Sequence, residues 1–109
     1  MDDILLVFTN LPDVVSAEKL ARRLVEMRAA ACVNQLAPCT STYRWEENIE
    51  TATEVPLLIK TTRAAYPRLE KLIREAHPYE LPEIIAVLVT AGLPSYLDWV
   101  GGETTTLKE

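Results

Sequence analysis

The sequence predicts an α+β domain of the split βαβ, or ferredoxin-like, plan, in which two βαβ halves share one sheet. Two observations predict this fold. Apolar runs typical of strands and stretches of helical periodicity follow one another in the order β-α-β-β-α-β, and a short helix comes after them. The chain has 109 residues, which suits one domain, so we expect residues 1–109 to form a single domain.

The first half reads as a strand followed by a helix. Residues 3–9 form a β-branched and aromatic run, which predicts a strand buried on both faces. Asn10-Leu11-Pro12 breaks the run, and Asp13 is placed to cap the next helix with its carboxylate. In that helix the apolar residues recur at helical spacing, which predicts the face that packs on the sheet: Ala17, Leu20, Ala21, Leu24 and Met27.

The middle of the chain reads as a long hairpin. Residues 31–45 and 49–61 are its two predicted strands, and the first is interrupted at Pro38. Glu46-Glu47-Asn48 makes the turn, in which we expect Asn48 to adopt a left-handed conformation. Pro56 falls inside the second strand, where it cannot donate a backbone hydrogen bond, and this indicates an edge or a bulge.

The last third reads as helix, strand and short helix. Pro67 lies near the first turn of the second helix, which ends at His77-Pro78. Residues 83–90 predict a further apolar strand. Residues 95–100 predict a short helix that ends at Gly101-Gly102, and a polar tail follows over residues 103–109.

The predicted hairpin is too long for the rest of the sheet. At ~3.3 Å per residue, residues 31–45 would extend over roughly 50 Å, whereas the first and last strands would span about 25 Å. The projecting end carries Tyr43, Trp45 and Ile49, and an isolated two-stranded ribbon is only marginally stable in water. We therefore expect a homo-oligomer in which identical hairpins cover one another. The alternative is a hairpin that bends back at Pro38.

Composition excludes several classes of function. The net charge of −5 and a pI near 4.9 argue against a nucleic-acid partner. No segment approaches the ~20 apolar residues that span a bilayer, so no membrane association is expected. The start of the chain lacks the features of a secretory signal, and its two cysteines are typical of reduced thiols, so we expect a cytoplasmic protein.

The strongest candidate for a functional site is the segment His77-Pro78-Tyr79-Glu80-Leu81-Pro82-Glu83-Ile84-Ile85, which holds the only histidine of the chain. Imidazole and carboxylate groups suit a borderline metal such as copper, so His77, Glu80 and Glu83 are candidate ligands. One histidine per chain cannot build a multi-imidazole site, so strong binding would need neighbouring chains. The alternative is a helix stop followed by a strand start, with His77 as a cap.

Other reactive side chains support less chemistry. Cys32 and Cys39 are expected about 23 Å apart on one strand, too far for a disulfide or a shared metal, so each is expected to be a small buried residue. Lys60 ends an apolar strand and could hold an anionic ligand; the alternative is a solvated strand end or a salt bridge to Glu54 or Glu80. No nucleophile elbow or Gly-rich phosphate loop occurs, so no enzymatic activity is expected.

Five segments carry motifs in the order found in one known family: Ala29-Ala30-Ala31-Cys32-Val33-Asn34, Ser41-Thr42-Tyr43-Arg44-Trp45, Glu54…Lys60-Thr61, His77-Pro78-Tyr79-Glu80-Leu81-Pro82-Glu83 and Tyr96-Leu97-Asp98-Trp99. On these residues nearly the whole chain resembles CutA, the divalent-cation tolerance proteins. The resemblance implies a ferredoxin-like fold, a cytoplasmic homotrimer whose long hairpins pair between subunits, and a link to divalent metal tolerance, copper above all. It establishes no catalytic reaction.

The resemblance leads to three hypotheses. The first is a non-enzymatic, metal-responsive homotrimer that binds copper (Cu²⁺) weakly through His77, with Glu80 or Glu83. The second is a module like the PII signalling proteins, whose small-molecule ligand lies in a cleft between subunits; the candidates to line that cleft are Lys60, Tyr79, Trp45, Cys32 and His77. The third is a structural trimer that scaffolds a partner protein.

The chain departs from the family's pattern at the proposed copper ligands. Some family members implicated in copper binding have Cys at the position of Phe8 and a second His at that of Ala76. Only His77 of that set is present here.

Overall fold

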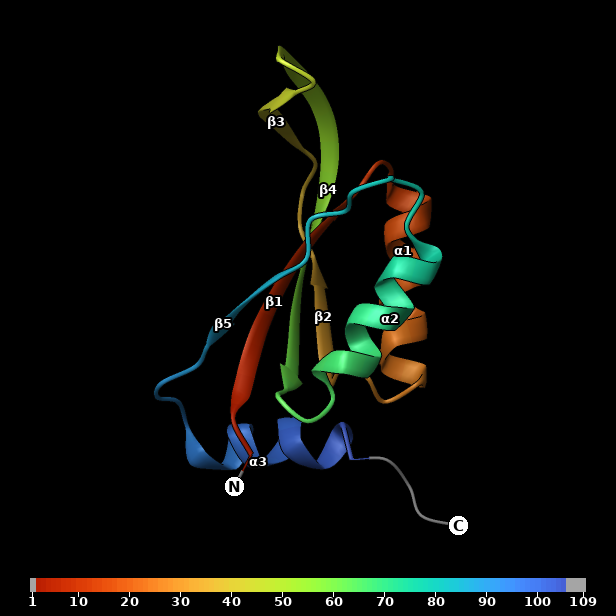
Figure 1. Cartoon of the computed structure of the whole chain (residues 1–109). Helices are drawn as coiled ribbons and strands as arrows, with labels where there is room; N and C mark the ends of the chain where they lie inside the picture. The colour runs from red at the N-terminus through yellow and green to blue at the C-terminus, as the bar shows by residue number, and fades with distance from the viewer. Residues whose placement is uncertain (1, 106–109) are drawn as a thin grey trace.

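The computed structural model describes residues 2–105, which form one five-stranded sheet and three helices (Figure 1). In chain order the elements are β1 (Ile4–Leu11), α1 (Val14–Glu26), β2 (Cys32–Gln35), β3 (Cys39–Trp45), β4 (Asn48–Thr62), α2 (Tyr66–Ala76), β5 (Ile85–Leu88) and α3 (Pro94–Glu103). Within the sheet the strands lie in the order β2-β4-β1-β5, with every pair antiparallel, and β3 pairs with the outer part of β4. The predicted ferredoxin-like plan is confirmed.

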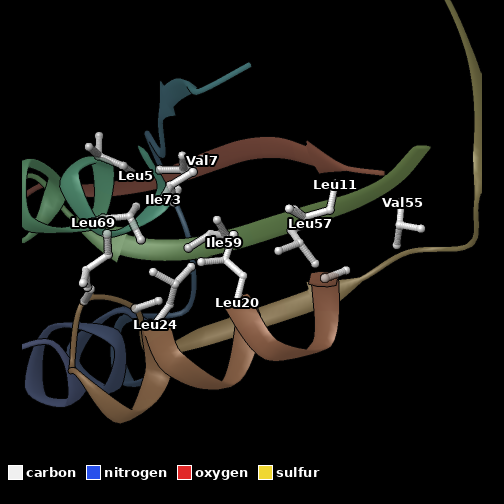
Figure 2. Close-up of a cluster of buried hydrophobic side chains, with 14 residues drawn as sticks. Leu5, Val7, Leu11, Leu20, Leu24, Val55, Leu57, Ile59, Leu69 and Ile73 are labelled. Atoms are coloured by element: carbon white, nitrogen blue, oxygen red, sulfur yellow. The ribbon is translucent and has the colours of Figure 1, made fainter. Parts of the chain in front are cut away.

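Helices α1 and α2 cover one face of the sheet, and their apolar stripes form the core with the strand residues that point toward them (Figure 2). Asp13 caps α1 as predicted, because its Oδ1 accepts a hydrogen bond of 2.8 Å from the Ser16 N–H. The largest fully buried side chains of this core belong to these elements: Val7, Leu11, Leu24, Leu57, Ile59, Leu69 and Ile73. None of the helices in residues 2–105 has the length and apolar character needed to span a bilayer.

Within the described residues the opposite face of the sheet is covered by a helix at one end, where Val100 of α3 and Ile4 of β1 belong to one buried cluster (Figure 1). The short edge strand β5 is exposed: Ile85 and Val87 keep 55% and 49% of their surface exposed. The sequence predicted an apolar strand over residues 83–90, but β5 covers only Ile85–Leu88 and all four of its residues are exposed. The apolar residues are present, but no element within residues 2–105 covers them.

The hairpin projects beyond the sheet, and the alternative of a hairpin bent back at Pro38 is wrong. Strand β1 pairs with β4 only as far as Val55, so residues 48–54 of β4 pair with β3 alone. The principal extents of 46 × 31 × 23 Å reflect this projection.

The break near Pro38 is a one-residue change of register. From Gln35 to Cys39 the chain takes four steps, while the paired residues of β4, Leu57 to Glu54, take three. The shift returns Cys32 and Cys39 to one face of β4, and both are free thiols. Cys39 is exposed, so the expectation of a buried Cys39 is wrong.

Pro56 lies at the place where β2 ends, in agreement with the predicted edge or bulge. Its carbonyl oxygen accepts a hydrogen bond of 2.9 Å from the Leu36 N–H, one residue beyond Gln35. Proline has no N–H to donate to the ladder. At Pro56 this costs no hydrogen bond, because β2 leaves the sheet on that side of β4.

Two boundaries differ from the sequence prediction. Strand β1 continues through Asn10 to Leu11, because both residues pair with β4. Helix α3 continues through Gly101 and Gly102 to Glu103, with Thr104 as its C-cap, so the glycines do not end it. Of the predicted tail, residues 106–109 lie outside the described part of the chain.

The turn of the hairpin also differs from its prediction. Trp45 pairs with Asn48, which leaves a two-residue loop whose residues both have positive φ, 49° at Glu46 and 70° at Glu47. Such a loop matches the twist of the strands when both central residues are left-handed. Asn48 was expected to take this conformation but begins β4 instead.

Replacing the turn residues should therefore stabilise the hairpin. Glu46→Asn combined with Glu47→Gly places the residues preferred at positive φ in this loop, and we expect the free energy of unfolding to rise by about 1 kcal/mol in urea titrations. The matched control is Glu50→Gly, in the extended part of β4, which should lower the free energy of unfolding. A double variant no more stable than wild type would contradict the account of the turn.

Candidate functional site

A groove of about 950 Å³ lies where the hairpin leaves the sheet. One wall comes from β3 and β4, the other from the segment that follows α2, and Asn10 joins them at the end of β1. We call this site the hairpin groove; it is lined by Asn10, Ser41, Thr42, Tyr43, Trp45, Ala52, Glu54, Pro78, Tyr79, Glu80, Leu81 and Glu83. Its volume is within the range of small-molecule sites.

Strand register places the hairpin side chains on one wall. Ser41, Tyr43 and Trp45 alternate along β3 and therefore share a face. Ser41 pairs with Ala52 across the ladder, and Glu54 lies two residues further along β4 on the same face. The extended strands thus present two aromatic rings and one carboxylate to the groove.

His77 fixes the opposite wall. It ends α2 in an extended conformation, as expected for a residue before proline, and only 8% of its surface is exposed. Its Nδ1 accepts a hydrogen bond of 3.2 Å from the Tyr79 N–H, which leaves the ring proton on Nε2, 2.5 Å from the carbonyl oxygen of Asn10. Both nitrogens are therefore used within the chain, and they fasten the segment after α2 to the end of β1.

Tyr79 and Glu54 join the two walls. The Tyr79 hydroxyl donates a hydrogen bond to the carboxylate of Glu54, a residue that is only 8% exposed. Burial, this hydrogen bond and the negative charge of Glu54 together raise the pKa of Tyr79 from 10.0 to about 12. The Tyr79 ring also lies 4.6 Å from that of His77, tilted by 51°. The phenol therefore stays protonated throughout the neutral range.

Glu80 and Glu83, the other candidate metal ligands, also line the hairpin groove. Glu83 Oε1 accepts a hydrogen bond of 3.0 Å from the Asn10 side-chain amide, and both carboxylates are exposed. Among residues 2–105, no group of three or more His, Cys, Asp and Glu side chains is arranged to hold a metal ion. A metal at His77 would have to displace one of its two hydrogen bonds.

Lys60 and Cys32 lie elsewhere. Lys60 is six residues from Glu54 on β4, about 20 Å at the usual rise of a strand, and it does not line the groove. Its Nζ donates a 2.6 Å hydrogen bond to Asn34 Oδ1 and lies 3.8 Å from Cys32 Sγ. Of the five residues proposed for a ligand cleft, two therefore line the groove, Trp45 and Tyr79, and His77 supports it.

Sequence reasoning missed Tyr43, Glu54 and Asn10 as groove residues. Glu54 was considered only as a salt-bridge partner for Lys60. The available signal was its position two residues from Ala52 on the face shared with Trp45, but this face is defined only once the turn is known to have two residues, so that Trp45 pairs with Asn48.

The chain resembles known proteins over most of its length. Residues 5–103 match the family model described as CutA1 divalent ion tolerance protein. The chain is 44% identical to "Protein CutA" of Mus musculus over 93% of its own length and spans 57% of that relative. Other relatives carry names that assign them to the chloroplast or the periplasm, so the family's name does not fix a location.

Solved structures of similar sequence share the fold. The crystal structure of CutA from Xylella fastidiosa is 48% identical, with a TM-score of 0.92, and the match covers 94% of this chain and 99% of that one. The structure titled PII-like protein CutA from Nostoc sp. PCC 7120 in apo form is 41% identical, with a TM-score of 0.86 and coverage of 93% and 97%.

The role of His77 in fastening the groove can be tested by stability. His77→Ala leaves the Asn10 carbonyl and the Tyr79 N–H without these partners, so we expect the free energy of unfolding to fall by about 1–3 kcal/mol in denaturant titrations. Arg74→Ala, exposed on the last turn of the same helix, is the matched control and should change it by less than about 0.5 kcal/mol. Equal stability of His77→Ala and wild type would contradict this role.

The Tyr79 pKa predicts a pH dependence of stability. Between pH 10 and about 12 the folded protein keeps the Tyr79 proton while the unfolded chain loses it, so the stabilisation is complete below pH 10 and is lost as pH rises toward 12. Tyr79→Phe should therefore show a shallower alkaline decline in the free energy of unfolding than wild type. Parallel declines over this window would exclude a raised Tyr79 pKa.

Proposed function

The chain belongs to the CutA1 divalent ion tolerance protein family, and from this premise we propose that it acts as a non-enzymatic homotrimer that binds divalent metal ions, copper among them, weakly. The observation that carries the metal proposal is the charge of the hairpin groove. Three carboxylates line it, from Glu54, Glu80 and Glu83, and its lining residues include no Lys or Arg. The net charge of −5 adds to the attraction for cations.

The trimer is supported by the surfaces that one chain leaves uncovered. Ile49 is 63% exposed and Trp45 39% exposed on a two-stranded ribbon that would be marginal alone, and the β5 edge exposes further apolar side chains. Neighbouring copies that pair along these strands would bury both kinds of surface. The number three comes from the family resemblance.

The metal site we propose is formed by His77, Glu80 and Glu83, completed by groups from a neighbouring subunit. Imidazole nitrogen and carboxylate oxygen are ligands that Cu²⁺ accepts. His77 can offer Nδ1 only when the Tyr79 N–H releases it, and that exchange subtracts from the binding energy. Weak rather than tight binding follows from this competition.

We also propose a cytoplasmic location, since Cys32 and Cys39 are free thiols and such thiols persist where the surroundings are reducing.

A second candidate function is small-molecule binding of the kind found in PII-like proteins. Two observations favour it: the hairpin groove has the volume of a ligand site, and a structural relative is itself described as PII-like. Trp45 and Tyr79 line the groove and would contact the ligand.

Copper titration of the metal-free protein at pH 7 tests the first function. We expect weak, saturable binding that falls roughly tenfold or more in Glu80→Gln/Glu83→Gln. Glu18→Gln/Glu75→Gln makes the same change of charge on exposed helix residues and should bind as wild type does. A ratio of one copper per chain would indicate a site in each subunit, and a ratio of one per three chains a site shared between subunits. Unsaturable binding that all variants share would contradict a site at these residues.

Sedimentation equilibrium at micromolar concentration tests the assembly. We expect a mass three times that of the 12.2 kDa chain. Removing apolar contacts at the tip with Ile49→Asp should shift the mass toward the monomer, whereas Glu47→Gln, in the turn next to it, should not. A wild-type monomer at this concentration would exclude the trimer.

A further inference from the structure

We infer that the hairpin groove binds an organic ammonium ion, with the charged nitrogen beside Glu54 and the alkyl part between aromatic rings. This inference rests on the second candidate function and names the chemical class of its ligand. Three features of the groove support it: the aromatic lining, the buried carboxylate of Glu54 that lacks a counterion within the described residues, and the negative charge of the groove as a whole.

The aromatic lining suits an organic cation. Tyr43 and Trp45 come from β3, and Tyr79 comes from the facing segment, so rings stand on both walls. Aromatic faces attract ammonium groups within about 6 Å of the ring centre and also pack well against alkyl carbon. Tyr79 is a neutral phenol across the neutral range, because burial and the neighbouring Glu54 raise its pKa further, from 10.0 to about 12.

Glu54 is a buried carboxylate whose charge has no counterion within the described residues. It is 8% exposed, and none of the ion pairs among residues 2–105 includes it. The neutral hydroxyl of Tyr79 supplies one hydrogen bond to this carboxylate, which can accept several. Buried charges are normally paired, so a cation that enters the groove would supply the missing charge.

The charge of the groove separates this ligand class from two others. An anion would meet three carboxylates, Glu54, Glu80 and Glu83, without a Lys or Arg among the lining residues. A bare metal ion would need several converging ligands, which the described residues of one chain do not form, so it would depend on groups from a neighbouring subunit. An alkylammonium ion needs one carboxylate and an apolar wall, and the groove offers both.

The experiment compares three probes of nearly equal size: n-butylammonium, butan-1-ol and butanoate. Binding to the metal-free chain of residues 1–109 is followed by the fluorescence of Trp45 in a Trp99→Phe background, since Trp99 lies on α3 at the opposite end of the molecule from the hairpin (Figure 1). We expect a saturable change with n-butylammonium and at least tenfold weaker responses to the alcohol and to the anion.

Variants locate the site. Glu54→Gln keeps the shape and a hydrogen-bond acceptor for Tyr79 but removes the charge, and should weaken n-butylammonium binding at least tenfold. Glu75→Gln, on the exposed face of α2, makes the same change of net charge and should leave binding unchanged. Glu80→Gln is a second groove variant at an exposed position and keeps the test decisive if Glu54→Gln fails to fold; it should weaken binding severalfold.

The outcomes separate the inference from the function on which it rests. Equal affinity for butan-1-ol, preference for butanoate, or unchanged binding in the groove variants would overturn the ammonium site. A saturable response to butanoate, or to nucleotides and small acids in a following panel, would leave the small-molecule function standing with another ligand class. No fluorescence response to any of the probes or to the panel would contradict both the ammonium site and the small-molecule function.

Discussion

The structure depends on one long strand. β4 runs for fifteen residues and, among the strands of residues 2–105, is the only one that pairs with three others: its inner half lies between β1 and β2, and its outer half pairs with β3. Backbone pairing over this whole length forces the hairpin to continue past the end of the sheet. Within residues 2–105 no helix or strand covers that continuation, and the proposed homotrimer would supply the cover.

The same projection creates the hairpin groove. Where β4 leaves β1 behind, the segment after α2 crosses the end of β1 and is fastened there by the two hydrogen bonds of His77. Glu54 and Tyr79 then connect the projecting ribbon to this segment. His77, which the sequence suggested as a metal ligand, thus also has a structural role within the chain. Any ligand of the groove is held by walls whose separation His77 helps to set.

Most of the fold and about half of the groove could be predicted from the sequence. Apolar periodicity predicted the strands and helices, because burial against a single core imposes those periods, and Asp13 and Pro67 marked the helix starts correctly. The groove was harder, because Tyr43 and Glu54 approach Tyr79 from positions remote in the chain. The face that Tyr43 shares with Glu54 depends on the pairing of Trp45 with Asn48, whereas the sequence placed a three-residue turn at residues 46–48. The turn was misassigned because the choice of Asn48 rested on residue preference, whereas strand pairing places the left-handed residues at Glu46 and Glu47.

The central claim is that the outer half of β4 is stabilised by contacts between chains. Amide hydrogen exchange resolved along β4 tests it most directly, because a lone two-stranded ribbon opens easily while strands held from both sides do not. The account predicts slow exchange for the ladder amides of residues 48–54, comparable with that of residues 55–62 in the core. Fast exchange confined to residues 48–54, with the core half protected, would mean that the hairpin stands free in solution and would contradict the account.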